Sequence, residues 1–220
     1  MCAIYERSPL RIQSVTVLIY PAGEQAAVII EIRRSVGREE IVLADDDPSK
    51  VDTSVLDAPI VGAFEEVLHE TGDCEVIVSY GTSAIDRLEM VSRVEDTPAE
   101  FAQAVSSDAV VSPSAKIGAG VVVNTNVTIG PRAVLDAHVM VDSHTSVSHD
   151  ASIGRASVVT PNVTICGGVS VGEACYLGPG AILTEDVTVG DRATVGAGAV
   201  VLDDVEPDTT VVGVPARPIR

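Results

Sequence analysis

The sequence predicts a small Rossmann-like α/β domain with a parallel sheet over residues 1–107, followed by a left-handed parallel β-helix over residues 108–220. An unbroken six-residue repeat runs through residues 109–204, whereas strand-like and helix-like segments alternate in the first hundred residues. The composition agrees with this division, because 46% of the residues are hydrophobic, only 3% are aromatic and Trp is absent. A core of Val, Ile, Leu and Ala suits a narrow, repetitive interior.

In the first hundred residues, three apolar segments are typical of strands and three other segments of helices. The expected strands are residues 14–20, 40–44 and 75–80, and the expected helices are residues 24–34, 63–70 and 83–94. This alternation predicts a parallel sheet, whose ligand site lies at the carboxyl ends of its strands. We therefore expect the loops at residues 20–24, 45–47 and 81–82 to lie together.

The repeat divides residues 109–204 into sixteen blocks of six, from AVVSPS to AVVLDD. The third residue of every block is aliphatic, from Val111 to Val201, and the first is small or β-branched. This period fits neither an amphipathic helix nor an alternating strand, but it is typical of a hexapeptide β-helix. Three blocks then form one triangular coil, with the third residue inside and a tight corner that Gly or Asn tolerates. Because no insertion interrupts the repeat, its smooth faces can pack on other copies, and we expect a trimer.

Net charge and cysteine content indicate which classes of binding partner and which cellular compartment to expect. The chain has 32 acidic against 14 basic residues, a net charge of −18, which disfavours nucleic acid and anionic membranes as partners. Cys2, Cys74, Cys166 and Cys175 form no C-x-x-C pair, which favours reduced thiols. The N-terminus shows no signal-peptide pattern, and no apolar run is long enough to span a bilayer. We therefore expect a cytoplasmic protein.

Several motifs, in order along the chain, resemble one enzyme family. They are LADDDPSK (residues 43–50), APIVGAFEEVL (58–68), SVSHDASIG (146–154), CGGVSVGE (166–173) and VVGVPARPI (211–219). Together they resemble the sugar acyltransferases of the sialic-acid O-acetyltransferase and bacillosamine-pathway N-acetyltransferase type. The resemblance implies a homotrimer whose α/β domain holds a nucleotide sugar and whose β-helix binds acetyl-CoA between two subunits, with no metal required.

The resemblance places the catalytic base at His149 and a supporting carboxylate at Asp150. The chemistry of acetyl transfer points the same way, because the attacking amine or hydroxyl must lose a proton as it attacks the thioester. An imidazole is the usual base at neutral pH, and a neighbouring carboxylate stabilises the imidazolium that forms. Backbone N–H groups at a corner can stabilise the developing oxyanion.

Further residues are implied by the resemblance as ligand contacts. The acetyl-CoA candidates are Gly167, Pro179, Ala197, Val158, Gly213 and Arg217, of which Val158 stands where the family has a second histidine. The candidates for the sugar or nucleotide are Ala22, Gly23, Glu24, Asp45, Asp46, Gly62 with Ala63, Gly81 and His144.

Some of these candidates have a second interpretation. Glu24 replaces the histidine that usually ends the family's nucleotide loop, and a carboxylate there disfavours a phosphate. Asp45 and Asp46 also suit a simple turn before Pro48. Arg87 is a weaker candidate, which we interpret as a residue on a solvated helix face.

The sequence therefore predicts an acetyl-CoA-dependent acetyltransferase of a nucleotide-linked amino sugar, with three alternatives left open. One is an O-acetyltransferase of a sugar or another small hydroxyl acceptor. The second is a zinc enzyme like the γ-class carbonic anhydrases, suggested by His138, His144 and His149. That class needs a third histidine two coils before His144, where this chain has Asp108. The third alternative is a non-catalytic β-helix scaffold.

Overall fold

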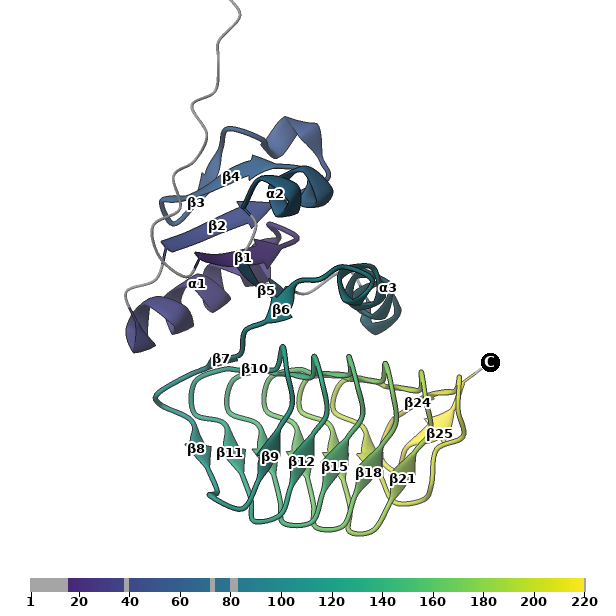
Figure 1. The fold of residues 1–220 in the computed structure, drawn as a ribbon. Helices are drawn as coiled ribbons and strands as arrows, with labels where there is room; N and C mark the ends of the chain where they lie inside the picture. Colours follow the sequence, from purple (N-terminus) through teal and green to yellow (C-terminus); the bar gives the residue numbers. More distant parts are fainter. Residues whose placement is uncertain (1–15, 38–39, 72–73, 80–82, 220) are drawn as a thin grey trace, which may run out of the picture.

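The computed structural model describes residues 16–37, 40–71, 74–79 and 83–219. The N-terminal domain contains a six-stranded sheet in the order β3-β4-β2-β1-β5-β6 (Figure 1). Its strands are β1 (Thr16–Tyr20), β2 (Glu40–Ala44), β3 (Ser54–Val55), β4 (Ala58–Gly62), β5 (Cys74–Val78) and β6 (Glu100–Phe101). All neighbours pair in parallel except β3 and β4, which form an antiparallel hairpin.

Helices cover both faces of this sheet. They are α1 (Glu24–Val36), α2 (Phe64–Thr71) and α3 (Ala84–Glu95), with a short 3-10 helix η1 (Pro48–Lys50) after β2. Ile29 and Ile30 of α1 pack on one face with Ile19 of β1, whereas Phe64 of α2 and Val91 of α3 pack on the other. The predicted parallel α/β layers are thus confirmed, with helix ends shifted by one or two residues.

The sixteen predicted blocks form sixteen two-residue strands, each at the second and third positions of its block. They are β8 (Val110–Val111), β9 (Lys116–Ile117), β10 (Val122–Val123), β11 (Thr128–Ile129), β12 (Val134–Leu135), β13 (Met140–Val141), β14 (Ser146–Val147), β15 (Ser152–Ile153), β16 (Val158–Val159), β17 (Thr164–Ile165), β18 (Ser170–Val171), β19 (Tyr176–Leu177), β20 (Ile182–Leu183), β21 (Thr188–Val189), β22 (Thr194–Val195) and β23 (Val200–Val201). The left-handed β-helix is confirmed.

The strands stack into three parallel sheets that form the faces of the prism. Face 1 is β7 (Ala104–Val105), β10, β13, β16, β19, β22, β24 (Thr210–Val212) and the antiparallel β25 (Arg217–Pro218). Face 2 is β8, β11, β14, β17, β20 and β23, and face 3 is β9, β12, β15, β18 and β21. Neighbouring strands pair eighteen residues apart, as Ile129 does with Val147. One coil therefore spans eighteen residues over most of the prism.

The core of the prism follows the repeat. The third residue of each block from Val123 to Val201 is at most 3% exposed. In fourteen of the sixteen blocks the sixth residue has a positive φ, between 52° and 71°. Gly and Asn occupy only some of these corners, and others hold Arg, His, Asp or Ala, so the expectation of Gly or Asn was too narrow. The backbone ladders on either side of each corner outweigh the modest cost of this conformation.

The α/β domain lies over face 1 of the prism (Figure 1). Val122 and Met140 of face 1 join the apolar cluster of α1. β7 already pairs with β10, although it precedes the predicted domain boundary after residue 107, which stays a prediction. Among the described helices, none has the length and apolar character needed to cross a membrane.

Arg87 of α3 links the two domains and corrects our interpretation of it as a solvated residue. Its side chain is 0% exposed and donates hydrogen bonds to the carbonyls of Val78, Ser79 and His138. Arg87 shares the buried face of α3 with Ala84, Val91 and Val94.

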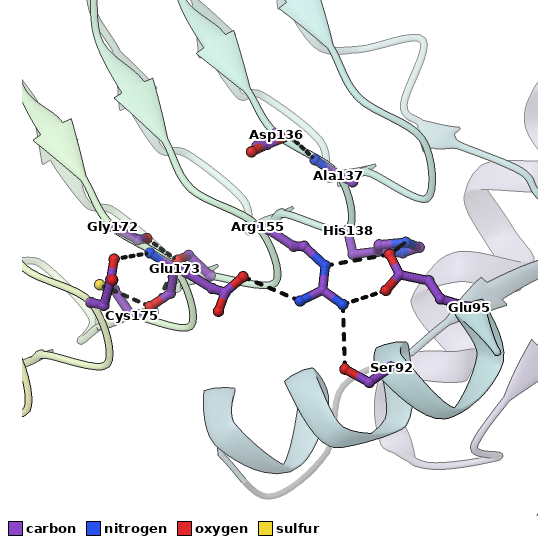
Figure 2. A network of polar contacts seen from close by, with 11 residues as sticks. Ser92, Glu95, Asp136, Ala137, His138, Arg155, Gly172, Glu173 and Cys175 are labelled. Carbon is purple, nitrogen blue, oxygen red and sulfur yellow. Dashed lines mark hydrogen bonds and ion pairs between the residues drawn. The ribbon is translucent and has the colours of Figure 1, made fainter.

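Arg155 makes a second, more exposed link between the domains. Figure 2 shows its guanidinium, which comes from the β-helix, reaching Ser92 and Glu95 of α3 while another of its nitrogens contacts Glu173.

Candidate active site

The corner between faces 2 and 3 that joins β14 to β15 carries His149 and Asp150. Asp150 is the sixth residue of its block, with φ near 60°, and its N–H donates to the Pro131 carbonyl of the preceding coil at 3.0 Å. Nδ1 of His149 lies 2.8 Å from Oδ2 of Asp150, and the His149 side chain is 63% exposed. The structure thus brings the two predicted catalytic residues together, with the rest of the ring open to a ligand.

Gly167 supplies the space in which the His149 ring lies. A Cβ added at Gly167 would come within 2.6 Å of Cε1 and 2.9 Å of Nε2 of His149. These separations are far below ordinary contact, so only glycine leaves the ring in this pose. Gly167 therefore shapes the His149 corner itself, in addition to its predicted place beside acetyl-CoA.

Arg132, which our sequence interpretation missed, completes the corner. Its Nε and Nη2 donate to the two carboxylate oxygens of Asp150 at 2.6 and 2.7 Å. This guanidinium, and then His149, hold the pKa of Asp150 well below its usual range. Arg132 and Asp150 are one coil apart, so adding the eighteen-residue coil to position 132 would have found the pair.

The other two β-helix histidines lie at the two remaining corners of the prism. His144 is exposed where face 1 meets face 2. His138, where face 3 meets face 1, is 1% exposed and packs edge-on against Phe101, with ring centroids 4.4 Å apart. Desolvation by burial, followed by the charge of Arg87, lowers the pKa of His138 to about 4.

The positions of the three histidines are relevant to the alternative of a zinc enzyme. His138, His144 and His149 lie at three different corners, so one chain does not gather them around a common point. Across the part of the chain that the structure describes, no cluster of three or more His, Cys, Asp or Glu side chains is placed to hold a metal ion.

The acetyl-CoA candidates lie at separate places on the prism. Pro179 and Ala197 are exposed on neighbouring coils at the corner between faces 1 and 2, whereas Gly167 belongs to the His149 corner. Gly213 and Arg217 lie near the C-terminal end, where Arg217 contacts Asp203 at 3.4 Å.

Val158 is a less favourable candidate. It is 3% exposed on face 1, the face that the α/β domain covers. The structure does not bring it to the His149 corner, and its role in binding acetyl-CoA stays a prediction that its burial does not favour.

In the α/β domain, Asp45 joins the loops at the carboxyl ends of β1 and β2. Its Oδ2 accepts from the Ala22 N–H at 3.1 Å and from Lys50 Nζ at 2.7 Å, and its Oδ1 accepts from the Asp47 N–H at 3.0 Å. Asp45 also donates its own N–H to the Gly62 carbonyl. Residues 20–24 and 45–47 therefore meet as expected, held together by Asp45, whereas residues 81–82 lie outside the described residues.

Asp46 anchors a second cluster at the same edge of the sheet. It accepts from the Tyr20 hydroxyl at 2.8 Å, from the Phe64 N–H at 3.2 Å and from Arg93. The guanidinium of Arg93 also contacts Glu65 and lies over the rings of Tyr20 and Phe64. The sequence interpretation named Asp46 but missed Arg93, whose partners are distant in sequence.

The remaining candidates at this edge are placed as follows. Gly23 caps α1 and Glu24 is its first, exposed residue; Ala63 directly precedes α2; and Gly81 lies outside the described residues. Glu24 puts a carboxylate at the N-terminus of α1, where the helix dipole favours negative charge.

Comparison with known proteins shows the family of this chain. The family described as bacterial transferase hexapeptide (six repeats) matches residues 168–203, and no curated protein matches the sequence. The structure of PerB from Caulobacter crescentus, in complex with CoA and GDP-perosamine, is 32% identical; the match covers 94% of this chain and 98% of PerB, with a TM-score of 0.86. This chain belongs to the hexapeptide-repeat sugar acyltransferases.

Two further solved structures share the architecture of this chain. The acetyltransferase domain of PglB from Neisseria gonorrhoeae FA1090 is 29% identical, with 94% and 100% of the two chains covered and a TM-score of 0.86. WeeI from Acinetobacter baumannii AYE is 19% identical over 93% and 99%, with a TM-score of 0.65, and shares the fold. The family resemblance predicted from the sequence motifs is confirmed.

Proposed function

We propose that this sugar acyltransferase transfers an acetyl group from acetyl-CoA to the amine of a nucleotide-linked amino sugar. The observation that carries the proposal is the end-to-end likeness to PerB, whose structure contains CoA and GDP-perosamine. The PglB acetyltransferase domain, also solved with acetyl-CoA, supports the same donor. The exposed His149–Asp150 pair supplies the base that this reaction needs.

In the proposed mechanism, Asp150 accepts a hydrogen bond from Nδ1–H of His149, which leaves Nε2 without a proton. The acceptor amine attacks the thioester carbonyl carbon, a C–N bond forms, and Nε2 takes the proton that the amine loses. The tetrahedral intermediate collapses with cleavage of the C–S bond. His149 returns the proton to the departing sulfur, so the products are the acetamido sugar and CoA.

A homotrimer would bring the acetyl-CoA candidates to the base. Pro179 and Ala197 lie at one edge of face 2, and His149 lies at the opposite edge. In a cyclic assembly, a corner of one copy meets a different corner of the next, because such interfaces are heterologous. The proposed acetyl-CoA groove therefore lies between two copies, with His149 from one and Pro179 from the other.

The nucleotide would bind at the loops that end β1, β2 and β4. Asp45 and Asp46 already accept hydrogen bonds from their own chain on both carboxylate oxygens. We therefore propose that they shape this pocket, and that backbone groups and Lys50 make the nearest polar contacts to the nucleotide. Lys50 also supplies positive charge in a strongly acidic protein.

A thiol-release assay tests the function directly. Purified protein is incubated with acetyl-CoA and a panel of amino sugars, each free and nucleotide-linked, and the acetylated product is verified by mass spectrometry. Release should depend on one nucleotide-linked acceptor and should fall by about 10²- to 10⁴-fold in His149→Ala. Activity that survives in His149→Ala, or an absence of CoA binding by calorimetry, would overturn the proposal.

A further inference from the structure

We propose that Arg132 is a positioning residue for acetyl transfer, which locks the Asp150 carboxylate in the one pose that orients His149 as a base. This inference rests on the proposed role of His149. Arg132 belongs to the preceding coil and reaches the catalytic corner only because the prism stacks residues eighteen apart.

The first support is the sharing of one oxygen between two donors. Oδ2 of Asp150 lies 2.7 Å from Nη2 of Arg132 and 2.8 Å from Nδ1 of His149. Oδ1 lies 2.6 Å from Nε of Arg132. The planar guanidinium is always protonated and holds the carboxylate as a fork, so the ionised carboxylate faces the ring and Nδ1 must be the nitrogen that carries the proton.

The second support is that little else holds the carboxylate. Asp150 is 43% exposed, and its side chain makes hydrogen bonds only with Arg132 and His149 among the described residues. An exposed carboxylate without the fork would occupy several rotamers, of which only some reach His149. Without Arg132, a fraction of the imidazole population would place its proton on Nε2 and could not act as a base.

The third support comes from comparison with a matched pair elsewhere on the prism. Arg192 donates from Nε and Nη2 to the two oxygens of Asp208 at 2.7 and 2.8 Å, the same fork at a different corner. Asp208 has no histidine partner, so this second fork holds a corner without orienting an imidazole. Arg192 therefore provides a control for the structural part of the effect of Arg132.

A conservative variant separates the fork from the charge. Arg132→Lys retains the positive charge but cannot donate to both carboxylate oxygens of Asp150 as a fork, so it should lower kcat as Arg132→Gln does.

A test that does not depend on activity uses the histidine ¹⁵N spectrum, since the chain contains only four histidines. The His149 signals are assigned by their disappearance in His149→Asn. In the wild type and Arg192→Gln we expect one tautomer, with the proton on Nδ1. In Arg132→Gln we expect a mixture of tautomers. An unchanged His149 tautomer in Arg132→Gln overturns the proposal.

The kinetic test uses the same variants, with circular dichroism to verify folding. Arg132→Gln should lower kcat about tenfold and leave both KM values unchanged, whereas Arg192→Gln should keep the wild-type kcat. A raised KM with unchanged kcat would mean that Arg132 binds a ligand directly, and equal losses in both variants would mean a purely structural role; either result overturns the proposal. The two proposals fail separately, because the tautomer can respond to Arg132 even if no sugar is acetylated.

Discussion

Gly167→Ala should abolish most of the acetyl transfer while leaving the fold intact. The added Cβ would lie 2.6 Å from Cε1 of His149, about 1 Å inside the normal separation of two carbon atoms. The ring must therefore move by about 1 Å, which stretches the 2.8 Å contact with Asp150 beyond a useful hydrogen bond. A misplacement of this size costs roughly 10²-fold in rate, so we expect kcat to fall by about that factor.

The same geometry limits the effect on stability. The ring that obstructs the new Cβ is 63% exposed and can turn toward solvent, and the φ of Gly167 is not in the left-handed region. The free energy of unfolding should therefore change by less than about 1 kcal/mol.

Thiol release measured at saturating acetyl-CoA separates a loss of kcat from weaker binding of CoA. In a His149→Ala background the Gly167→Ala change should have no further effect on kcat, because the ring it displaces is gone. A folded Gly167→Ala protein with wild-type kcat would refute the placement of the base at this corner.

Three other changes follow from the structure. Asp150→Asn should lower kcat by about 10²-fold or more, because the amide cannot hold Nδ1–H of His149 as the carboxylate does. The thiol-release assay measures this loss, and an unchanged kcat would contradict the pairing of Asp150 with His149 as a base. The pKa of His138 is about 4 in the folded protein and 6.5 in the unfolded chain, so the unfolded chain binds a proton at a higher pH than the folded protein does. The contribution of His138 to the free energy of unfolding should therefore be fully present above pH 6.5 and should fall by roughly 3 kcal/mol as the pH drops toward 4. Urea unfolding at pH 7.5 and 4.5 tests this, and His138→Phe should reduce the difference. Arg87→Met should lower the free energy of unfolding by about 3 kcal/mol, because it leaves buried carbonyls without their donor; a urea midpoint near that of the wild type would contradict the buried geometry.

The β-helix could be predicted almost residue by residue, because each six-residue block of the repeat forms one face of a coil. Each aliphatic third residue specifies an inward position, and the strand pairs follow once three blocks make a coil. The family resemblance, carried by SVSHDASIG, pointed to His149 and Asp150 as the base and its carboxylate. It did not reveal Arg132, because Arg132 is eighteen residues from Asp150 in the sequence and only the coil brings the two together.

The α/β domain could be predicted less completely. The long apolar strands β1, β2 and β5 carry a clear local signal. In contrast, β3 and β6 have two residues each and form strands only because they pair with neighbouring strands of the sheet. Arg87 shows the same limit, since a charged residue in a helix is normally solvated. Its burial depends on carbonyls of β5 and of the prism, and these contacts arise only in the assembled fold.

The uninterrupted coil also restricts how this chain can change in length. Inserting or deleting six residues within the prism keeps the inward residues inward, yet it rotates everything beyond that point by one face. Between Arg132 and Asp150, such a change would carry His149 to another corner and separate Asp150 from Arg132. Eighteen residues is the smallest insertion or deletion upstream of this segment that preserves every corner, so length variation in active relatives should come in whole coils, or in loops that protrude from the prism.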